Sequence, residues 1–219
     1  MIGCSLNFSN GSSPIILCLG AHSDDIEIGC GGTILRFLDS YPNTRVEWIV
    51  FSAQGRRADE AKASAQDFLA KAGEKHVIIK DYRDGFFPYI GADIKEFFEQ
   101  LKLQVNPDII FSHNRNDLHQ DHRLLAELTW NAFRNHFILE YEIPKYDGDL
   151  GSPNVFVHLD DNICREKVEL LKRHFMTQDS KDWFDKELFM ALLRMRGMES
   201  HAPFGYAESF YARKMLFNM

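Results

Sequence analysis

Short apolar runs alternate with longer amphipathic stretches from residue 15 to residue 137, and this alternation restricts the fold more than any other feature. Each apolar run has the length of a buried strand, and the stretches between them favour helices. The expected strands span 15–19, 46–51, 76–79 and 108–112, and the expected helices span 33–38, 58–72, 94–103 and 121–137. Strands that alternate with helices predict an α/β fold with a doubly wound, mainly parallel sheet flanked by helices.

The pattern is less regular after Ile138. We expect a loop rich in proline and glycine at 144–153, a strand at 155–159 and two helices before Gly197. The segment 206–217 interleaves aromatic and apolar residues with charged ones, so it could form a late strand or part of the wall of a site.

Length and composition indicate one domain, 1–219, because no segment resembles an interdomain linker. The net charge of −7 argues against nucleic acid as a partner. No apolar run reaches the roughly 18 residues of a membrane span, and Met1–Asn10 lacks the features of a signal peptide, so we expect a cytoplasmic location. The four cysteines contain no C-x-x-C pair and fit buried apolar positions. The oligomeric state stays open.

A histidine and three acids crowd the turn after the first expected strand. They are His22, Asp24, Asp25 and Glu27. Such crowding is electrostatically costly without a cation. Asp24 and Asp25 could cap the following helix, but capping accounts for one acid and not for two beside a histidine.

A second polar cluster follows the strand at 108–112. It contains three histidines and two aspartates: His113, Asp117, His119, Asp121 and His122. In a doubly wound sheet ordered 3-2-1-4-5, strands one and four are neighbours, and the loops after them border the crevice where such folds bind ligands. We therefore expect the two clusters to meet in space.

The two clusters together offer the ligands of a catalytic zinc. Such an ion takes three protein ligands and leaves one position for water, and two histidines with one acid would complete the set. Asp24, Asp117 and Asp121 are then surplus acids that could orient the ligand histidines or act as a general base.

The residues of the two clusters resemble the sequence motifs of a known protein family. His22-Ser23-Asp24-Asp25 with Gly29-x-Gly31-Gly32, together with His119-x-Asp121-His122, resembles the paired signature of the PIG-L/LmbE-like family of metal-dependent N-acetylglucosaminyl deacetylases. Further landmarks are Arg57-x-x-Glu60, Asp84-Gly85 and Tyr206-Ala207-Glu208-x-Phe210, so the resemblance runs from about residue 15 to residue 217. It implies a Rossmann-like fold and hydrolysis of the N-acetyl group of an amino-sugar small molecule.

The resemblance also implies a ligand set. His22, Asp25 and His122 would bind one divalent metal, with Zn²⁺ expected and iron left open. Ser23 stands where the family usually has proline. Serine makes the turn less rigid but removes no ligand.

The remaining roles come from the same resemblance. Asp24 would be the general base, and His119 would assist it, oriented by Asp121. Arg57 and Asp84 would contact the substrate, whose sugar and carrier the sequence leaves open.

The other histidines are not expected to bind the metal. His113 and His201 lie near the motifs but match no ligand position. Ordinary hydrogen-bonding roles are expected for His76, His136, His158 and His174.

A dinucleotide-binding turn is one alternative, because Gly29, Gly31 and Gly32 follow a strand. The G-x-G-x-x-G order is absent, and Asp24 and Asp25 would face the phosphates. The glycines fit close helix packing better.

Two further alternatives concern the metal site. The 117–122 motif approaches the H-x-H-x-D-H pattern of dinuclear metallo-β-lactamase-like hydrolases, but Asp117 occupies a histidine position and the parallel α/β order differs. The chain could also be a non-catalytic metal- or sugar-binding module. Asp24 and His119, which metal binding does not require, favour an enzyme.

Overall fold

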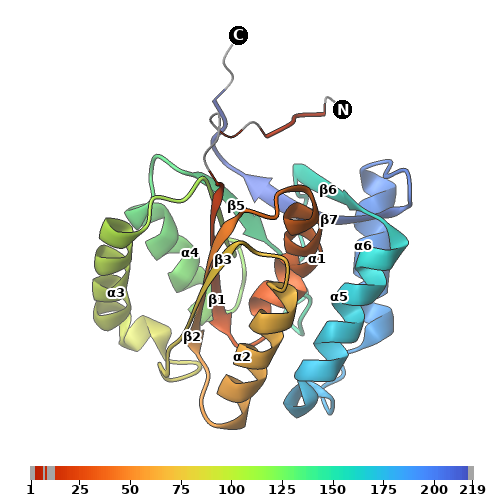
Figure 1. Ribbon diagram of the computed structural model, residues 1–219. Helices are drawn as coiled ribbons and strands as arrows, with labels where there is room; N and C mark the ends of the chain where they lie inside the picture. The colour runs from red at the N-terminus through yellow and green to blue at the C-terminus, as the bar shows by residue number, and fades with distance from the viewer. Residues whose placement is uncertain (1–2, 7, 9–12, 217–219) are drawn as a thin grey trace.

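Five parallel strands form most of a seven-stranded sheet in the computed structural model, which describes residues 3–6, 8 and 13–216 (Figure 1). The strands are β1 Ile15–His22, β2 Arg45–Ser52, β3 Glu74–Ile79, β4 Ile109–His113, β5 Phe137–Tyr141, β6 Val155–Leu159 and β7 Tyr206–Ala212. They lie in the order β3-β2-β1-β4-β5-β7-β6, with β7 antiparallel to both neighbours. The mainly parallel α/β fold is confirmed.

Helices cover both faces of the sheet (Figure 1). They are α1 Asp25–Ser40, α2 Arg56–Phe68, α3 Gly91–Gln104, α4 Gln120–Ala132, α5 Asp161–His174 and α6 Lys186–Glu199, with short 3-10 helices η1 Phe87–Tyr89 and η2 Met176–Gln178. α3 and α4 pack together on one face, and α1, α2 and α5 pack together on the other. Among the described residues, no helix is long and apolar enough to span a bilayer.

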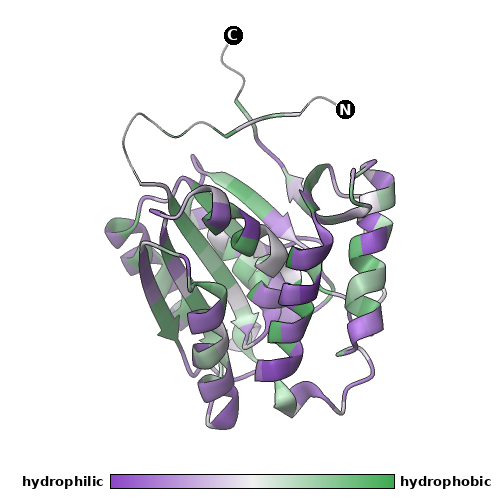
Figure 2. Ribbon diagram, turned by 45° about the vertical axis from the view of Figure 1, so that its right-hand side comes forward, coloured by the Kyte–Doolittle hydropathy of each residue, from purple (hydrophilic) through white to green (hydrophobic). Residues whose placement is uncertain are grey.

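The central strands are apolar on both sides because each face of the sheet has its own core. In β1, Ile16 and Cys18 join one core, whereas Leu17 and Leu19 join the other. Figure 2 shows these apolar strands between helices whose outer faces are hydrophilic. This double burial explains the continuous apolar runs in the sequence.

Two expected boundaries are wrong. The helix expected at 121–137 ends at Ala132, and the strand β5 that follows it was not predicted. β5 has only five residues, and one of them is Glu140, whose buried carboxylate accepts hydrogen bonds from Trp130 and Arg213. A charged residue at such a position hides a strand in the sequence pattern.

The first helix also differs from its expected range. It begins at Asp25 rather than near Thr33. Three glycines lie in its first turns, and they hid this part of the helix in the sequence pattern. The late strand expected in 206–217 is β7, and Phe217 lies outside the described residues.

Close packing explains the glycines of α1, as expected. A Cβ on Gly31 would lie 2.6 Å from the Phe68 ring, and a Cβ on Gly32 would lie 2.6 Å from Leu159. A Cβ on Gly29 would overlap the ring of Tyr141. Larger residues would push α1 off the sheet and displace the turn that precedes it.

Glu208 and Lys167 form a buried ion pair that makes hydrogen bonds to the backbone of α1. The backbone N–H groups of Gly32 and Thr33 donate to the two Glu208 oxygens, at 2.8 and 2.6 Å. Lys167 Nζ lies 2.6 Å from both Glu208 Oε1 and the carbonyl oxygen of Ile28, four residues before Gly32. The family landmark at Glu208 thus holds α1 in place.

Replacing Glu208 should therefore destabilise the fold. Glu208→Ala leaves the Lys167 ammonium buried without its partner, and we expect a loss of about 3–5 kcal/mol in the free energy of unfolding. Urea denaturation measures the loss. Glu169→Ala, on the exposed side of α5, is the matched control and should change stability by less than about 0.5 kcal/mol. Equal effects of the two changes would contradict the structural role of the pair.

Candidate metal centre and active site

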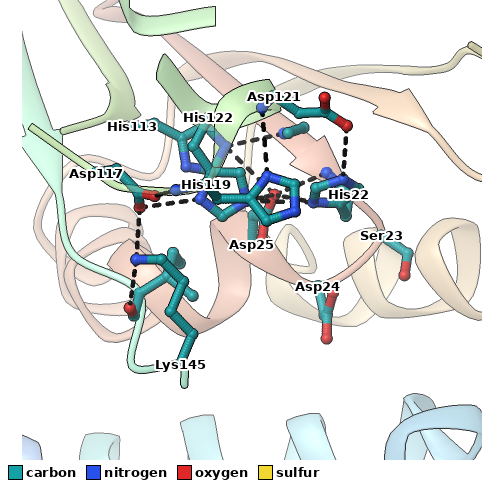
Figure 3. A network of polar contacts seen from close by, with 12 residues as sticks. His22, Ser23, Asp24, Asp25, His113, Asp117, His119, Asp121, His122 and Lys145 are labelled. Carbon is teal, nitrogen blue, oxygen red and sulfur yellow. Dashed lines mark hydrogen bonds and ion pairs between the residues drawn. The ribbon is translucent and has the colours of Figure 1, made fainter. Parts of the chain in front are cut away.

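Two loops meet at the carboxyl edge of the sheet, as the sequence predicts. β1 ends at His22 directly before α1, and β4 ends at His113 before the loop that leads into α4. β1 and β4 are parallel neighbours, so their ends lie side by side. Figure 3 shows the resulting cluster of imidazoles and carboxylates.

Three donor atoms in this cluster form a compact triangle. His22 Nδ1 lies 3.2 Å from His122 Nε2 and 3.4 Å from Asp25 Oδ2, and the last two atoms are 3.5 Å apart. Ligand atoms about 2.0–2.2 Å from a tetrahedral zinc lie about 3.3–3.6 Å from one another. All three residues are buried. The donor set and its spacing fit one zinc ion with a fourth position left for water.

The far nitrogen of each histidine in the triangle faces a carboxylate. His122 Nδ1 lies 2.9 Å from Asp117 Oδ2. His22 Nε2 lies 3.1 Å from Asp84 Oδ1 and 3.3 Å from Asp121 Oδ2. A proton on each far nitrogen leaves the lone pair of the near nitrogen free for a metal.

The electrostatics of the cluster differ between its two candidate ligand histidines: burial lowers the pKa of His122 to about 4, whereas the pKa of His22 is raised. Burial lowers the pKa of His22, but hydrogen bonds to Asp121 and Asp25 outweigh it and hold that pKa well above its ordinary value. Burial likewise raises the pKa of Asp25, but the neighbouring imidazoles of His122 and His113 bring it well below the ordinary range. A cation at the centre of the triangle would meet the same favourable field.

His113 lies beside the triangle. Its Nε2 is 3.3 Å from Asp25 Oδ2, and its ring stacks on His122 at 3.9 Å. The backbone N–H of Ala21 donates to the same Nε2 at 2.9 Å, which occupies its lone pair. His113 therefore packs against Asp25 and His122, with its Nε2 engaged by the backbone of Ala21, although Asp25, His113 and His122 also lie close enough together to hold an ion.

The remaining histidines lie elsewhere. His76, His136 and His174 make hydrogen bonds or ion pairs with Glu47, Asn106 and Asp67. His158 belongs to β6, and His201 lies in an exposed turn after α6.

The contacts of Asp121 correct the expected orientation of His119. The Asp121 carboxylate contacts His22 and accepts hydrogen bonds from the backbone N–H groups of Gly85 and Phe87, at 2.7 and 3.1 Å. It is the backbone N–H of Asp121 that donates to His119 Nδ1, at 3.3 Å. Gly85 has φ 77°, a conformation that favours glycine. Asp121 thus fixes His22 with its side chain and His119 with its main chain.

His119 is half-buried against the ligands. Its ring meets the edge of His22 at 4.9 Å and lies 4.5 Å from the ring of His122. Burial and the neighbouring His22 lower the pKa of His119. Since Nδ1 accepts a hydrogen bond, the neutral ring carries its proton on Nε2.

Asp24 is a buried acid whose carboxylate makes few polar contacts. Its Oδ2 has no hydrogen-bond partner among the described residues, and Arg57 Nη2 lies 3.8 Å from Oδ1. Burial, followed by the charge of Asp25, raises the pKa of Asp24 to about 6. Its side chain does not cap α1, so capping does not explain it. In Figure 3 the carboxylate points away from the imidazole rings.

Arg57 and Asp84 lie at the rim of the cluster. Arg57 Nη1 is 3.2 Å from Asp84 Oδ2, and Arg57 Nε donates to Ser23 Oγ at 3.2 Å. The Asp84 side chain is 54% exposed, so it can reach a solute as well as His22. Ser23 has a use that proline would lack, because its hydroxyl oxygen accepts the hydrogen bond from Arg57.

Lys145 is the residue of the site that the sequence did not indicate. Its Nζ lies 2.9 Å from Asp117 Oδ2 and 2.6 Å from Asp149 Oδ2. It comes from the connection between β5 and β6, where the sequence offers no motif. Asp117 was noted as a surplus acid that could orient a ligand histidine, and its contact with His122 matches that description.

Similarity to known proteins agrees with the motifs. The chain is 26% identical, over 73% of its length and 89% of the relative, to a protein of Escherichia coli (strain K12) described as the uncharacterized deacetylase YaiS. Its fold matches N,N'-diacetylchitobiose deacetylase from Pyrococcus horikoshii with a TM-score of 0.66 and 20% identity, covering 90% of this chain and 83% of the other.

The same fold also serves a different reaction. GalB, the 4-carboxy-2-hydroxymuconate hydratase of Pseudomonas putida KT2440, matches with a TM-score of 0.75 and 16% identity over 94% of this chain and 98% of the other. Structural likeness at this identity establishes the fold and not the reaction. The sequence family is more specific, because residues 17–133, more than half of the chain, match it. The chain belongs to the GlcNAc-PI de-N-acetylase (PIG-L) family of deacetylases.

Proposed function

We propose that this protein is a zinc-dependent hydrolase that removes the N-acetyl group from an amino-sugar-containing small molecule. The observation that carries the proposal is the triangle of His22 Nδ1, Asp25 Oδ2 and His122 Nε2, which has zinc spacing and lies next to a nearly free buried acid, Asp24. Membership of a de-N-acetylase family supports the reaction class.

His22, Asp25 and His122 would hold the metal, with Zn²⁺ the ion that suits two imidazoles and a carboxylate best. When bound, the ion would polarise the amide carbonyl and lower the pKa of a water molecule at its open position. A non-catalytic binding module would need the same three ligands but neither Asp24 nor His119.

Asp24 would take the proton of the attacking water. Its pKa of about 6 leaves it ionised at neutral pH and close in basicity to a histidine, which suits a general base. The carboxylate must turn toward the rings, or act through one intervening water, since it points away from them here. The proton held by Asp24 can then pass to the departing amine.

His119 would act as a hydrogen-bond donor. Its Nε2–H is available because Nδ1 accepts from the backbone of Asp121. A donor that is already oriented stabilises the negative charge that develops on the carbonyl oxygen during attack. Arg57 and Asp84, at the rim, are proposed to bind the hydroxyl groups of the sugar.

Acetate release tests the function directly. The protein is assayed on a panel of N-acetylated amino sugars, free and as glycosides, after loading with Zn²⁺ and after chelation. We expect one acetate for each free amine formed, loss of activity on chelation, and recovery when Zn²⁺ is restored. Binding of a sugar without any acetate release would favour the binding module instead.

Asp24 and Asp25 are adjacent acids with different proposed tasks, so their variants separate the mechanism from a simple helix-capping role. Asp24→Asn should keep the metal and the fold but lose roughly 10²–10⁴ in kcat. Asp25→Ala should lose the metal itself. Asp59→Asn, in the exposed first turn of α2, is the control and should behave as wild type.

Metal content, melting temperature and kcat are measured on the same preparations. Added Zn²⁺ should not rescue Asp24→Asn. A wild-type kcat for Asp24→Asn would show that the base is another residue.

A further inference from the structure

The ammonium of Lys145 lies between the carboxylates of Asp117 and Asp149, beside the histidine cluster. Figure 3 shows Lys145 and Asp117 next to His122. Lys145, Asp117 and Asp149 have side chains that are 10%, 3% and 7% exposed. Lys145 joins the other two, with Nζ 2.9 Å from Asp117 Oδ2 and 2.6 Å from Asp149 Oδ2. The cluster thus ties the β5–β6 connection to the loop between β4 and α4.

Asp117 also contacts two residues of the site, His122 and His119. Its Oδ2, the oxygen that Lys145 contacts, also accepts from His122 Nδ1 at 2.9 Å. Its Oδ1 accepts from the backbone N–H of His119 at 2.8 Å. One carboxylate therefore fixes both the ring of a proposed ligand and the position of the proposed hydrogen-bond donor.

The two loops are also joined by a second contact. Asp149 Oδ2 accepts from the backbone N–H of Leu118, which directly precedes His119, at 2.7 Å. Asp149 is thus held from two sides, and it keeps Lys145 over Asp117.

Charge makes Lys145 necessary to this arrangement. Asp117 and Asp149 bring two negative charges into a buried region, where unpaired charge is costly and like charges repel. Without the ammonium between them, the two loops would separate, and the Asp117 carboxylate would move away from His122.

We infer that Lys145, anchored by Asp149, is a positioning residue that holds Asp117 on His122, so that His122 presents Nε2 to the metal. Lys145 contacts neither the three proposed ligand atoms nor Asp24. The inference rests on the proposed function for the presence of the metal, but its test needs no substrate.

The test is the dissociation constant for Zn²⁺, measured on the apoprotein by competition with a chromophoric chelator. Lys145→Met keeps most of the length of the side chain and removes its charge, and should raise the dissociation constant by about 10–100-fold, as loss of other groups that orient metal ligands does. Lys145→Arg can still bridge both carboxylates and should recover most of the affinity. Lys62→Met, at an exposed position of α2, is the matched control and should leave it unchanged.

A double-mutant cycle separates this role from a general effect on the fold. If Lys145 acts through Asp117, the effects of Lys145→Met and Asp117→Asn on the constant should be clearly less than additive. Additive effects, or a constant for Lys145→Met within about twofold of wild type, would overturn the inference.

Three further outcomes also decide the matter. Should Lys145→Met fail to fold, Asp149→Asn gives the deciding value, since it removes one of the two carboxylates that hold Lys145: a raised constant supports the inference and an unchanged one overturns it. A wild-type protein that bound no metal would overturn the proposed function, and the inference with it. Tight wild-type binding with an unaffected Lys145→Met would overturn the inference alone.

Discussion

The parallel pairing of β1 with β4 is the constraint on which the site depends. Residues about 90 positions apart in the sequence face each other in this ladder, with Ile16 opposite Ile109 and Cys18 opposite Phe111. The pairing brings His22 next to the first turn of α4, which carries His122. This is the topological switch point of the sheet, where β2 and β3 extend from β1 on one side and β5 extends from β4 on the other. The glycines of α1 and the pair Glu208–Lys167 then set how the Asp25 end of that helix meets the cluster.

Pairing of imidazoles with carboxylates gives the site its order. His22 is held by Asp121 and Asp84, and His122 by Asp117, so the ring orientations follow from acids in the first turn of α4, the loop after β3 and the loop between β4 and α4. The acids outnumber the neighbouring cations, which makes the centre favourable for a metal ion. Asp24 differs from them because it contacts no histidine and its Oδ2 has no hydrogen-bond partner among the described residues, which is consistent with the proton transfer proposed for it.

Sequence patterns predicted those parts of the molecule that depend on residues close together in the sequence. The strands β1, β2 and β4 are mainly apolar because both of their faces are buried, whereas the edge strand β3 is only half-buried and keeps a short apolar run at its end. The two motifs each lie within a few residues. β5 was missed because Glu140 interrupts its apolar character. The residue that pairs with the buried Glu140 carboxylate, Arg213, is distant in the sequence, so no local pattern showed that a charge could be buried there.

Contacts between distant segments had no signal in the sequence. The direction of the Asp121 carboxylate toward His22 depends on how Gly85 and Phe87 approach from the loop after β3. The place of Lys145 depends on a connection whose course follows from the antiparallel β5–β7–β6 end of the sheet. Neither could be obtained from residue spacing.

The central claim is the ligand set, and X-ray diffraction at the zinc absorption edge from crystals of the Zn²⁺-loaded protein tests it most directly. We expect one anomalous peak per chain, about 2.0–2.2 Å from His22 Nδ1, His122 Nε2 and the Asp25 carboxylate. A peak between His22 Nε2, Asp84 and Asp121, whose atoms also lie close enough to hold an ion, would contradict it, as would no peak at saturating zinc.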